Sequence, residues 1–565
     1  MTHIQKRLGR WFAAGPVLAA FIAGSLALRA QENDFSLFPG NFFIPGNLVV
    51  ARSVYTNGNN IIAGVTNLPP GCGSATDPCT AAVTSSAYPY VFNNDTVDGS
   101  FGVTSKIYLD QITPFAFPFT SLEVPNSTEA GVTATSDHLV TSFSSKSELS
   151  LNLSVDGRTL TFMGYFAPVS AIDVSNSNTP GEVDPTNPVG PAYYRSVGEI
   201  ATLGSFHFTE TNAYTGDNGR AAILNDEPGA GVVYMAGNAG NGTGKVQPAS
   251  TILSTGAQIL TPSSEPEALQ TPGTPTAVGS FNVTQLGDKI DKVGKDTNFR
   301  GLTVYNNVVY YTKGSGSNGV NTVYFVDTTG TVCTNTNGVG LPVAGAKLPT
   351  APLALSSTNP TTIQDNGLQP DNMCILKGFP TLLAKSASGV SYPFGIWFAS
   401  PTVLYVADEG NGNTGTTVAN FYTAATLAEN PTAGLQKWTF NGTEWELAYI
   451  LTDGLDLGVP YTVPGYPTGL NDGPGGSGFP WAPATAGLRN ITGIVNFDGT
   501  ATIYAITSTI SGSGDQGADP NKLVAITDEL SATTPPAWEN FLTVKSAGYG
   551  EVLRGVAFTP GTPRF

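Results

Sequence analysis

Four arginines recur at corresponding places in the chain, each near the start of a short apolar segment. They are Arg220, Arg300, Arg489 and Arg554, and Lys146 follows the same pattern in one further segment. Basic residues are scarce here, with 25 Lys and Arg among 565 residues, so this recurrence stands out. A guanidinium offers forked N–H donors to a carboxylate or a phosphate. The pattern predicts a site for a small anionic ligand or, as the alternative, arginines that pair with neighbouring segments and hold them together.

A second polar group lies in the segment Asp408-Glu409-Gly410-Asn411-Gly412-Asn413. The side chains of Asp408, Glu409 and Asn411 carry the oxygen ligands that Ca²⁺ prefers on flexible turns. The spacing lacks the bidentate glutamate of an EF-hand loop. The corresponding segment 237–242 contains no acid, which favours a turn-forming role as the alternative. Ca²⁺ is the one cofactor that the sequence suggests.

Nucleophilic catalysis finds little support in the sequence. Beyond the first thirty residues only His138 and His207 remain, and neither belongs to a motif with a serine or cysteine. No Gly-x-Ser-x-Gly elbow is present. A hydrolase of lactonase or esterase type could still use carboxylates and Ca²⁺ as a Lewis acid. We expect a protein that is not an enzyme and keep this hydrolase as an alternative.

The four cysteines suggest two disulfides. Cys72 and Cys79 share one Gly- and Pro-rich loop, where an oxidising compartment favours a local bond. Cys333 and Cys374 would then form the second bond and clamp the long segment between them. Four cysteines allow three connectivities, so the other two pairings stay open.

The residues above lie within a recurring unit. A short apolar strand that begins with Arg-Gly or a similar pair is followed by a turn, a Tyr-containing strand and a Gly/Asn-rich loop. Arg300–Val304 with Val308–Tyr311, and Phe394–Phe398 with Val403–Ala407, are two examples. Two more strands follow each loop, most clearly at 435–449, where Asn441-Gly442 marks a hairpin. Four strands per unit, with a period well above forty residues, predict an all-β fold of β-propeller type.

The spacing of the units predicts the number of propeller blades. First strands begin near residues 144, 220, 300, 394, 489 and 553. The last of these lies too close to the C-terminus to build a blade, whereas the segment 47–55 resembles a second strand without a first. We expect the C-terminal strand to complete the N-terminal blade, closing a ring of six four-stranded antiparallel blades and removing exposed sheet edges. Seven blades remain open if the region near 250–295 contains another.

One hairpin has a wider resemblance. The segment 149–162, LSLNLSVDGRTLTF, resembles the L-x-L-S-x-D-G-[RK]-x-L hairpin of bacterial periplasmic and lactonase-type propellers. The Asp156-Gly157 pair would form the tight turn between the first two strands of a blade. The remaining units lack the signatures of named repeat families. The whole pattern is similar to secreted bacterial propellers of unknown role.

Composition limits the possible partners. Gly and Pro number 66 and 41, and 12% of residues are charged, which favours short strands and turns over long helices. The net charge of −17 argues against binding to nucleic acid or to an anionic membrane surface. After the N-terminal segment, nothing approaches the roughly 18 apolar residues of a membrane span. We expect a monomer.

The N-terminus resembles a secretory signal. Lys6, Arg7 and Arg10 precede an apolar run at 11–28, and Ala30 offers a cleavage point before Gln31. An uncleaved membrane anchor is the alternative, although Gly15-Pro16 and Gly24 interrupt the apolar run. The expected organisation is a signal peptide over 1–30, an extension over 31–46 and one propeller over 47–565. We therefore expect a secreted or periplasmic protein.

These observations lead to three functional hypotheses. The first is an exported propeller that binds an anionic ligand or a protein partner through its arginine-bearing, loop-rich face. The second is the Ca²⁺-dependent hydrolase acting at the mouth of the central channel. The third is a structural cell-surface scaffold without a small-molecule site.

Overall fold

The computed structural model describes the strands of this chain and most of the turns between them. The described residues are 43–55, 64–68, 72, 79–81, 102–125, 138–143, 148–180, 190–238, 256–262, 278–280, 298–314, 319–332, 338–351, 373–384, 389–472, 476–513 and 517–563. All of them belong to one unit, Phe43–Phe565. The expected signal peptide lies outside the described residues. In the described part of the chain, no helix is long and apolar enough to cross a membrane.

The described chain is all-β, as the sequence predicts, and its sheets form an arrangement that resembles a β-propeller. Four of the sheets are small. They are β11–β14 (Gly219–Asn225, Val232–Gly237, Ala257–Leu260, Val278–Ser280); β15–β17 with β19 and β18 (Phe299–Tyr305, Val308–Lys313, Thr322–Val326, Met373–Leu376, Val339–Gly340); β20–β23 (Pro393–Ser400, Val403–Asp408, Gly434–Phe440, Trp445–Leu451); and β24–β27 (Ala484–Val495, Thr500–Ile510, Lys522–Glu529, Leu542–Ser546). Apart from the parallel pair β18–β19, neighbouring strands in these sheets are antiparallel.

A larger sheet of nine strands contains both ends of the described chain. Its main path runs β10-β9-β8-β6-β4-β1-β28, and β5 and β7 pair with β4 and β8. The strands are β1 (Leu48–Val54), β4 (Thr104–Ile112), β5 (Pro118–Glu123), β6 (His138–Ser142), β7 (Asn152–Leu153), β8 (Thr159–Ala167), β9 (Arg195–Ala201), β10 (Phe206–Thr211) and β28 (Glu551–Phe558). The short pair β2 (Asn67–Leu68) and β3 (Thr80–Ala81) stands apart from this sheet.

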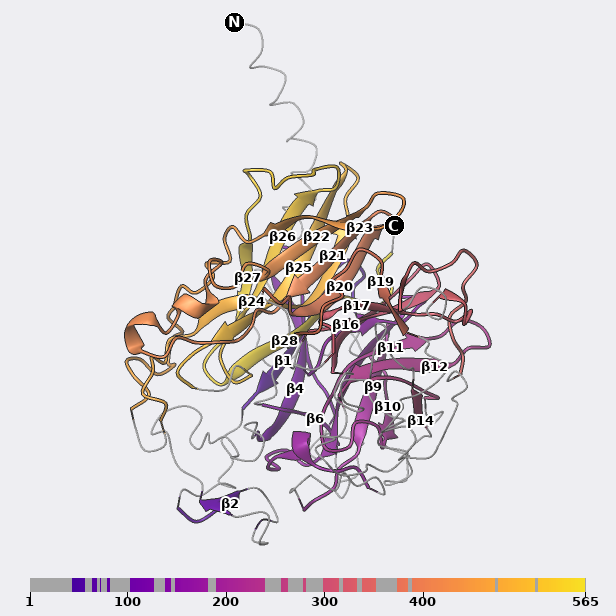
Figure 1. Cartoon of the computed structure of the whole chain (residues 1–565). Helices are drawn as coiled ribbons and strands as arrows, with labels where there is room; N and C mark the ends of the chain where they lie inside the picture. The colour runs from indigo at the N-terminus through magenta and orange to yellow at the C-terminus, as the bar shows by residue number, and fades with distance from the viewer. Residues whose placement is uncertain are drawn as a thin grey trace, which may run out of the picture. The chain divides into compact units, whose positions relative to one another are not determined.

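The C-terminal strand lies beside the first strand, as the sequence predicts for these two segments. β28 pairs antiparallel with β1 from Leu48 opposite Phe558 to Val54 opposite Glu551. Figure 1 shows the yellow arrow of β28 next to the indigo arrow of β1. The other edge of β1 pairs with β4, so β1 is covered on both edges. Backbone groups that an open array would expose are therefore hydrogen-bonded.

Two predicted hairpin turns are present. Between β7 and β8, the Ser154 N–H donates to the Thr159 carbonyl, and Gly157 has a φ of 77° that a side chain would resist. Between β22 and β23, Asn441 Oδ1 accepts hydrogen bonds from the N–H groups of Thr443 and Glu444. The second loop therefore spans four residues, 441–444, instead of the two expected of a tight Asn-Gly turn.

The predicted first strands coincide with β11, β15, β20, β24 and β28. The start expected near residue 144 does not, since 144–147 lie outside the described residues and β7 begins at Asn152. The described parts of the region 250–295 are β13 and β14, which complete the sheet begun by β11. They supply the third and fourth strands of an existing sheet, not a separate unit.

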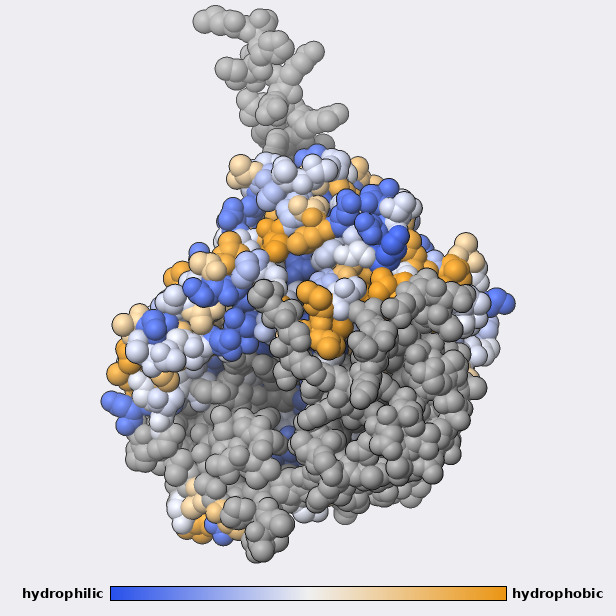
Figure 2. Space-filling model, viewed as in Figure 1, coloured by the Kyte–Doolittle hydropathy of each residue, from blue (hydrophilic) through white to orange (hydrophobic). Residues whose placement is uncertain are grey.

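Aromatic residues fill the spaces between neighbouring sheets. The rings of Tyr305 on β15 and Phe398 on β20 stack with centroids 4.5 Å apart. Trp438 and Trp445 belong to the same buried cluster as Phe325 and Tyr311 of the preceding sheet. On the face in Figure 2, hydrophobic and hydrophilic residues are interspersed over the sheets β20–β23 and β24–β27.

Candidate functional site

Six strands surround a common cavity, and we call them the inner strands: β7, β11, β15, β20, β24 and β28. The predicted arginines lie on four of them, and the cavity is lined by residues further along the same strands. Arg300, for example, precedes the cavity residues Thr303 to Tyr305 on β15. On these four strands the arginine therefore comes before the part of the strand that lines the cavity.

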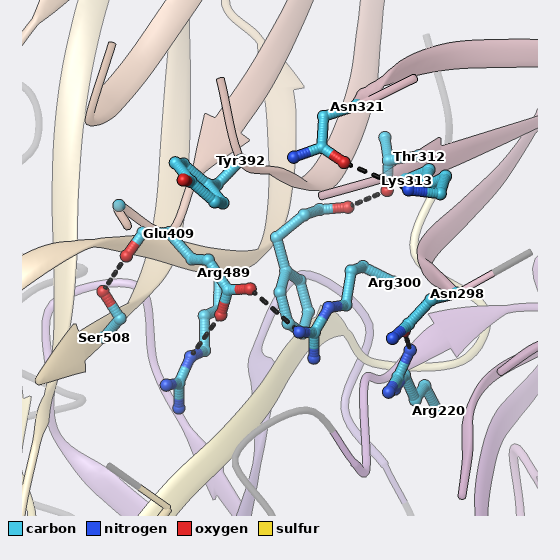
Figure 3. Close-up of polar contacts among 12 residues, drawn as sticks. Arg220, Asn298, Arg300, Thr312, Lys313, Asn321, Tyr392, Glu409, Arg489 and Ser508 are labelled. Atoms are coloured by element: carbon cyan, nitrogen blue, oxygen red, sulfur yellow. Dashed lines mark hydrogen bonds and ion pairs between the residues drawn. The ribbon is translucent and has the colours of Figure 1, made fainter. Parts of the chain in front are cut away.

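Two arginines from different sheets pair with one buried carboxylate. Glu409, just after β21, lies between Arg300 of β15 and Arg489 of β24 (Figure 3). Its Oε1 lies 3.4 Å from Arg300 Nη2, and its Oε2 lies 3.3 Å from Arg489 Nε. All three side chains are at least 95% buried. We call Arg220, Arg300, Arg489 and Glu409 the arginine cluster.

Arg220 of β11 is the third cation of the cluster. Its Nη1 donates to the Phe299 carbonyl over 2.8 Å and to the side chain of Asn298, both at the start of the next sheet (Figure 3). Burial, reinforced by the charge of Arg300, lowers the pKa of Arg220 to about 9. The same two causes act on Arg489, although the nearby Glu409 carboxylate opposes them, and the pKa of Arg489 is lowered. Burial is the largest cause of both shifts, and the carboxylates of Asp217 and Glu409 oppose the lowering of the Arg220 pKa.

Each arginine of the cluster also has a nitrogen without a hydrogen-bond partner. Among the described residues, these buried atoms are Arg220 Nε, Arg300 Nε and Arg489 Nη2. An unsatisfied buried donor costs roughly 1–3 kcal/mol, and more when it is charged. An acceptor with negative charge would satisfy these donors and reduce the repulsion between the three guanidiniums.

Arg554 donates hydrogen bonds to groups outside the arginine cluster. Its Nε donates to Ser53 Oγ over 3.2 Å, and its Nη2 donates to the backbone carbonyls of Ser142, Phe143 and Gly517. These contacts join β28 to β1 and to the end of β6, which is the holding role expected as the alternative. Lys146, the fifth predicted basic residue, lies outside the described residues.

The predicted Ca²⁺ ligands use their oxygens within the protein. Asp408 accepts hydrogen bonds from Ser391 Oγ, the Tyr392 and Gly410 N–H groups and Gln436 Nε2. Burial raises the pKa of Asp408 to about 6, although these hydrogen bonds oppose the shift.

The side-chain oxygens of Glu409 and Asn411 also have partners within the protein. Asn411 Oδ1 caps a turn by accepting from the Asn413 N–H, and Glu409 faces two arginines. No group of three His, Cys, Asp or Glu residues that could hold a metal occurs within the described ranges. At this segment Asp408 and Asn411 each accept a hydrogen bond from the backbone N–H two residues further on, as turn-forming residues do.

The described residues include three of the four cysteines. Cys72 and Cys79 are bonded to each other, as predicted. Cys374 is buried in β19 and is also disulfide-bonded. Its expected partner, Cys333, lies outside the described residues.

Sequence reasoning missed two buried basic residues. Arg195 on β9 is fully buried, and its guanidinium donates to the carbonyls of Tyr193, Ser177 and Asp217. Lys437 on β22 is also fully buried, 2.9 Å from Asp528 of the next sheet. Neither residue lies on an inner strand, so the recurring Arg-Gly pattern gave no signal for them.

No protein-family model matches the chain, and no curated protein matches it.

Proposed function

We propose that the chain is an exported, closed propeller of six blades that binds a small anion at its arginine cluster. In this proposal the nine-stranded sheet counts as two blades, β28-β1-β4-β5 and β7-β8-β9-β10, which β6 joins. The other four sheets are one blade each.

Contacts between consecutive sheets support the count of six. Ser150, just before β7, donates to the Arg220 carbonyl over 3.1 Å, and Arg220 donates in turn to Phe299. Four further contacts continue the series: Thr312 Oγ1 to the Phe394 carbonyl, Ser508 Oγ to the Glu409 carbonyl, the Val556 N–H to Asn490 Oδ1, and Arg554 Nη2 to the Ser142 carbonyl. The sixth contact returns to the segment before β7, where the series began.

The observation that carries the anion proposal is the set of unpaired buried donors in the arginine cluster. Arg300 and Arg489 share the carboxylate of Glu409, and Arg220 donates to neutral groups at the start of β15. Each of the three guanidiniums retains a nitrogen without a hydrogen-bond partner. A buried charge that lacks a full counter-charge is strongly unfavourable, so a bound anion would stabilise the folded chain. The forked donors suit a carboxylate or a phosphate-like oxyanion.

Calorimetric titration and thermal melting test this proposal. Phosphate, sulfate, citrate and acetate should be titrated into the folded full chain at constant ionic strength. At least one of them should bind with a stoichiometry near one and raise the melting temperature with concentration, as expected of a ligand that binds only the folded state.

The matched variants are Arg489→Gln, Arg489→Lys and Arg158→Gln. Arg158 is 79% exposed in the β7–β8 turn, so its loss should leave anion binding unchanged. Arg489→Gln should weaken anion binding by at least tenfold, and Arg489→Lys should retain part of it. If none of the anions binds the unaltered chain, or if Arg158→Gln weakens binding as much as Arg489→Gln, the proposal fails and the arginines only join the sheets.

A further inference from the structure

The cavity between the inner strands is separate from the arginine cluster. The cavity has a volume of about 230 Å³, and every one of the six inner strands contributes to its wall. The C-terminal segment Thr562–Pro563 completes the lining. Because residues of the arginine cluster do not line it, this cavity would be occupied independently of the proposed anion.

The chemistry of the wall excludes a charged ligand. None of the residues lining the cavity is Asp, Glu, Lys, Arg or His, and most are aliphatic or aromatic. An ion entering it would lose hydration without gaining a counter-charge. The wall also contains the polar side chains of Thr303, Thr492 and Thr562, so it suits a neutral molecule with both apolar and polar atoms.

An indole ring supplies a flat surface in this wall. Trp397 of β20 is half-buried and lies over Gly493 of β24, where a Cβ atom would come within 2.7 Å of three ring atoms. The Trp397 ring also stacks on Tyr405 with centroids 5.8 Å apart. These two contacts hold the ring in place, and the part of it that lines the cavity offers rigid apolar surface to a ligand.

One polar side chain of the wall has an unpaired donor that would orient a ligand. Asn152 of β7 lines the cavity, and its Nδ2 is buried without a hydrogen-bond partner among the described residues. A ligand oxygen that accepts from this amide would satisfy the donor, and a ligand without such an oxygen would leave it unpaired. The volume of the cavity limits the size of the ligand. A cavity of about 150 Å³ takes up benzene, so this larger cavity fits two fused rings.

We infer that this cavity, with Trp397 and Asn152 in its wall, binds a neutral bicyclic aromatic molecule that carries one hydrogen-bond acceptor. This inference concerns a site at the opposite end of the inner strands from the anion. It stands or falls separately from the proposed function.

Equilibrium dialysis of the full chain against two probes of equal size tests it. Coumarin has a carbonyl acceptor, and naphthalene has none. Coumarin should bind with a stoichiometry near one and about tenfold more tightly than naphthalene. The change Asn152→Leu should remove that preference while naphthalene binding persists. Saturating phosphate should leave coumarin binding unchanged.

A cavity-filling variant locates the site. Thr492→Phe places a ring in the cavity and should abolish binding of both probes, whereas Thr543→Phe, on the exposed outer strand β27, adds the same ring elsewhere and should have no effect. If Thr492→Phe does not fold, Val495→Phe at the same wall replaces it. No coumarin binding to the unaltered chain, or full binding to the folded cavity variants, would overturn the inference. Loss of anion binding in these variants is not expected.

Discussion

Asn490 and Val556 are joined by a hydrogen bond between two sheets, in which the backbone N–H of Val556 donates to Asn490 Oδ1 over 2.6 Å. Both residues are buried, and Asn490 Nδ2 also points to the Leu151 carbonyl. The change Asn490→Ala leaves a buried backbone N–H without its acceptor. We expect it to lower the free energy of unfolding by about 1–3 kcal/mol in urea titrations. The exposed Asn413→Ala should change it by less than about 0.5 kcal/mol; an equal loss in both variants would contradict a linking role for Asn490.

Gly301, the glycine of one Arg-Gly pair, should not tolerate a side chain. A Cβ atom at this position would lie 1.9 Å from the Phe394 carbonyl oxygen of the next sheet. Gly301→Ala should therefore destabilise the protein by about 3 kcal/mol or more, because two inner strands would have to separate. Gly548→Ala is the control, since its nearest neighbour would be 3.4 Å away at the end of the flexible Glu551 side chain. Thermal melts of both variants check this, and equal stability would show that the strands can move apart freely.

The buried pair of Lys437 and Asp528 should behave as a single unit. Lys437 Nζ is 2.9 Å from Asp528 Oδ2, and both side chains are fully buried. Lys437→Met leaves the carboxylate without its counter-charge and should cost about 3–5 kcal/mol of stability. The double variant with Asp528→Asn should be more stable than the sum of the single effects predicts. Strict additivity in this double-mutant cycle would refute the coupling. Arg158→Met, which breaks the exposed pair with Asp156, should have an effect within about 0.5 kcal/mol.

Glu539 should make stability depend on pH. Burial and a hydrogen bond with Asp528 raise the pKa of Glu539 to about 8, above its ordinary value of 4.5, while the charge of Lys437 opposes the shift. Between these two values the folded chain retains a proton that the unfolded chain has released. The contribution of Glu539 to stability is therefore fully present below about pH 4.5 and is lost as the pH rises towards 8.

Urea unfolding at pH 5 and pH 8 measures this dependence. Glu539→Gln should match the unaltered chain at pH 5, because glutamine resembles the protonated acid, and should lose less stability at pH 8. Other titrating groups are common to both chains and cancel in the comparison. Parallel pH profiles for the two chains would disprove the assignment to Glu539.

The sequence predicts the repeating part of this fold better than its polar contacts. The Arg-Gly starts and the Asp156-Gly157 turn depend on local patterns, and the structure contains them. The pairing of the two end segments follows from the repeat, because each segment supplies a strand that the other lacks. The contact of Glu409 with Arg300 and Arg489 depends on which sheets become neighbours, and no local pattern encodes that distance. The strand β6 was missed because 138–142 pairs with β4 at one end and with β8 at the other, a role that the repeat does not contain. For the same reason, the sequence did not predict the contacts of Glu409 with two arginines from other sheets.

The pairing of β28 with β1 also has a consequence for the order of events in biosynthesis. During translation, β1 emerges about five hundred residues before its partner, Glu551–Phe558. Until that segment leaves the ribosome, one edge of β1 has no strand to pair with and is open to other chains. Contacts this distant in sequence also slow folding. The β1 edge of the nascent chain therefore stays open to wrong partners until Glu551–Phe558 has been synthesised.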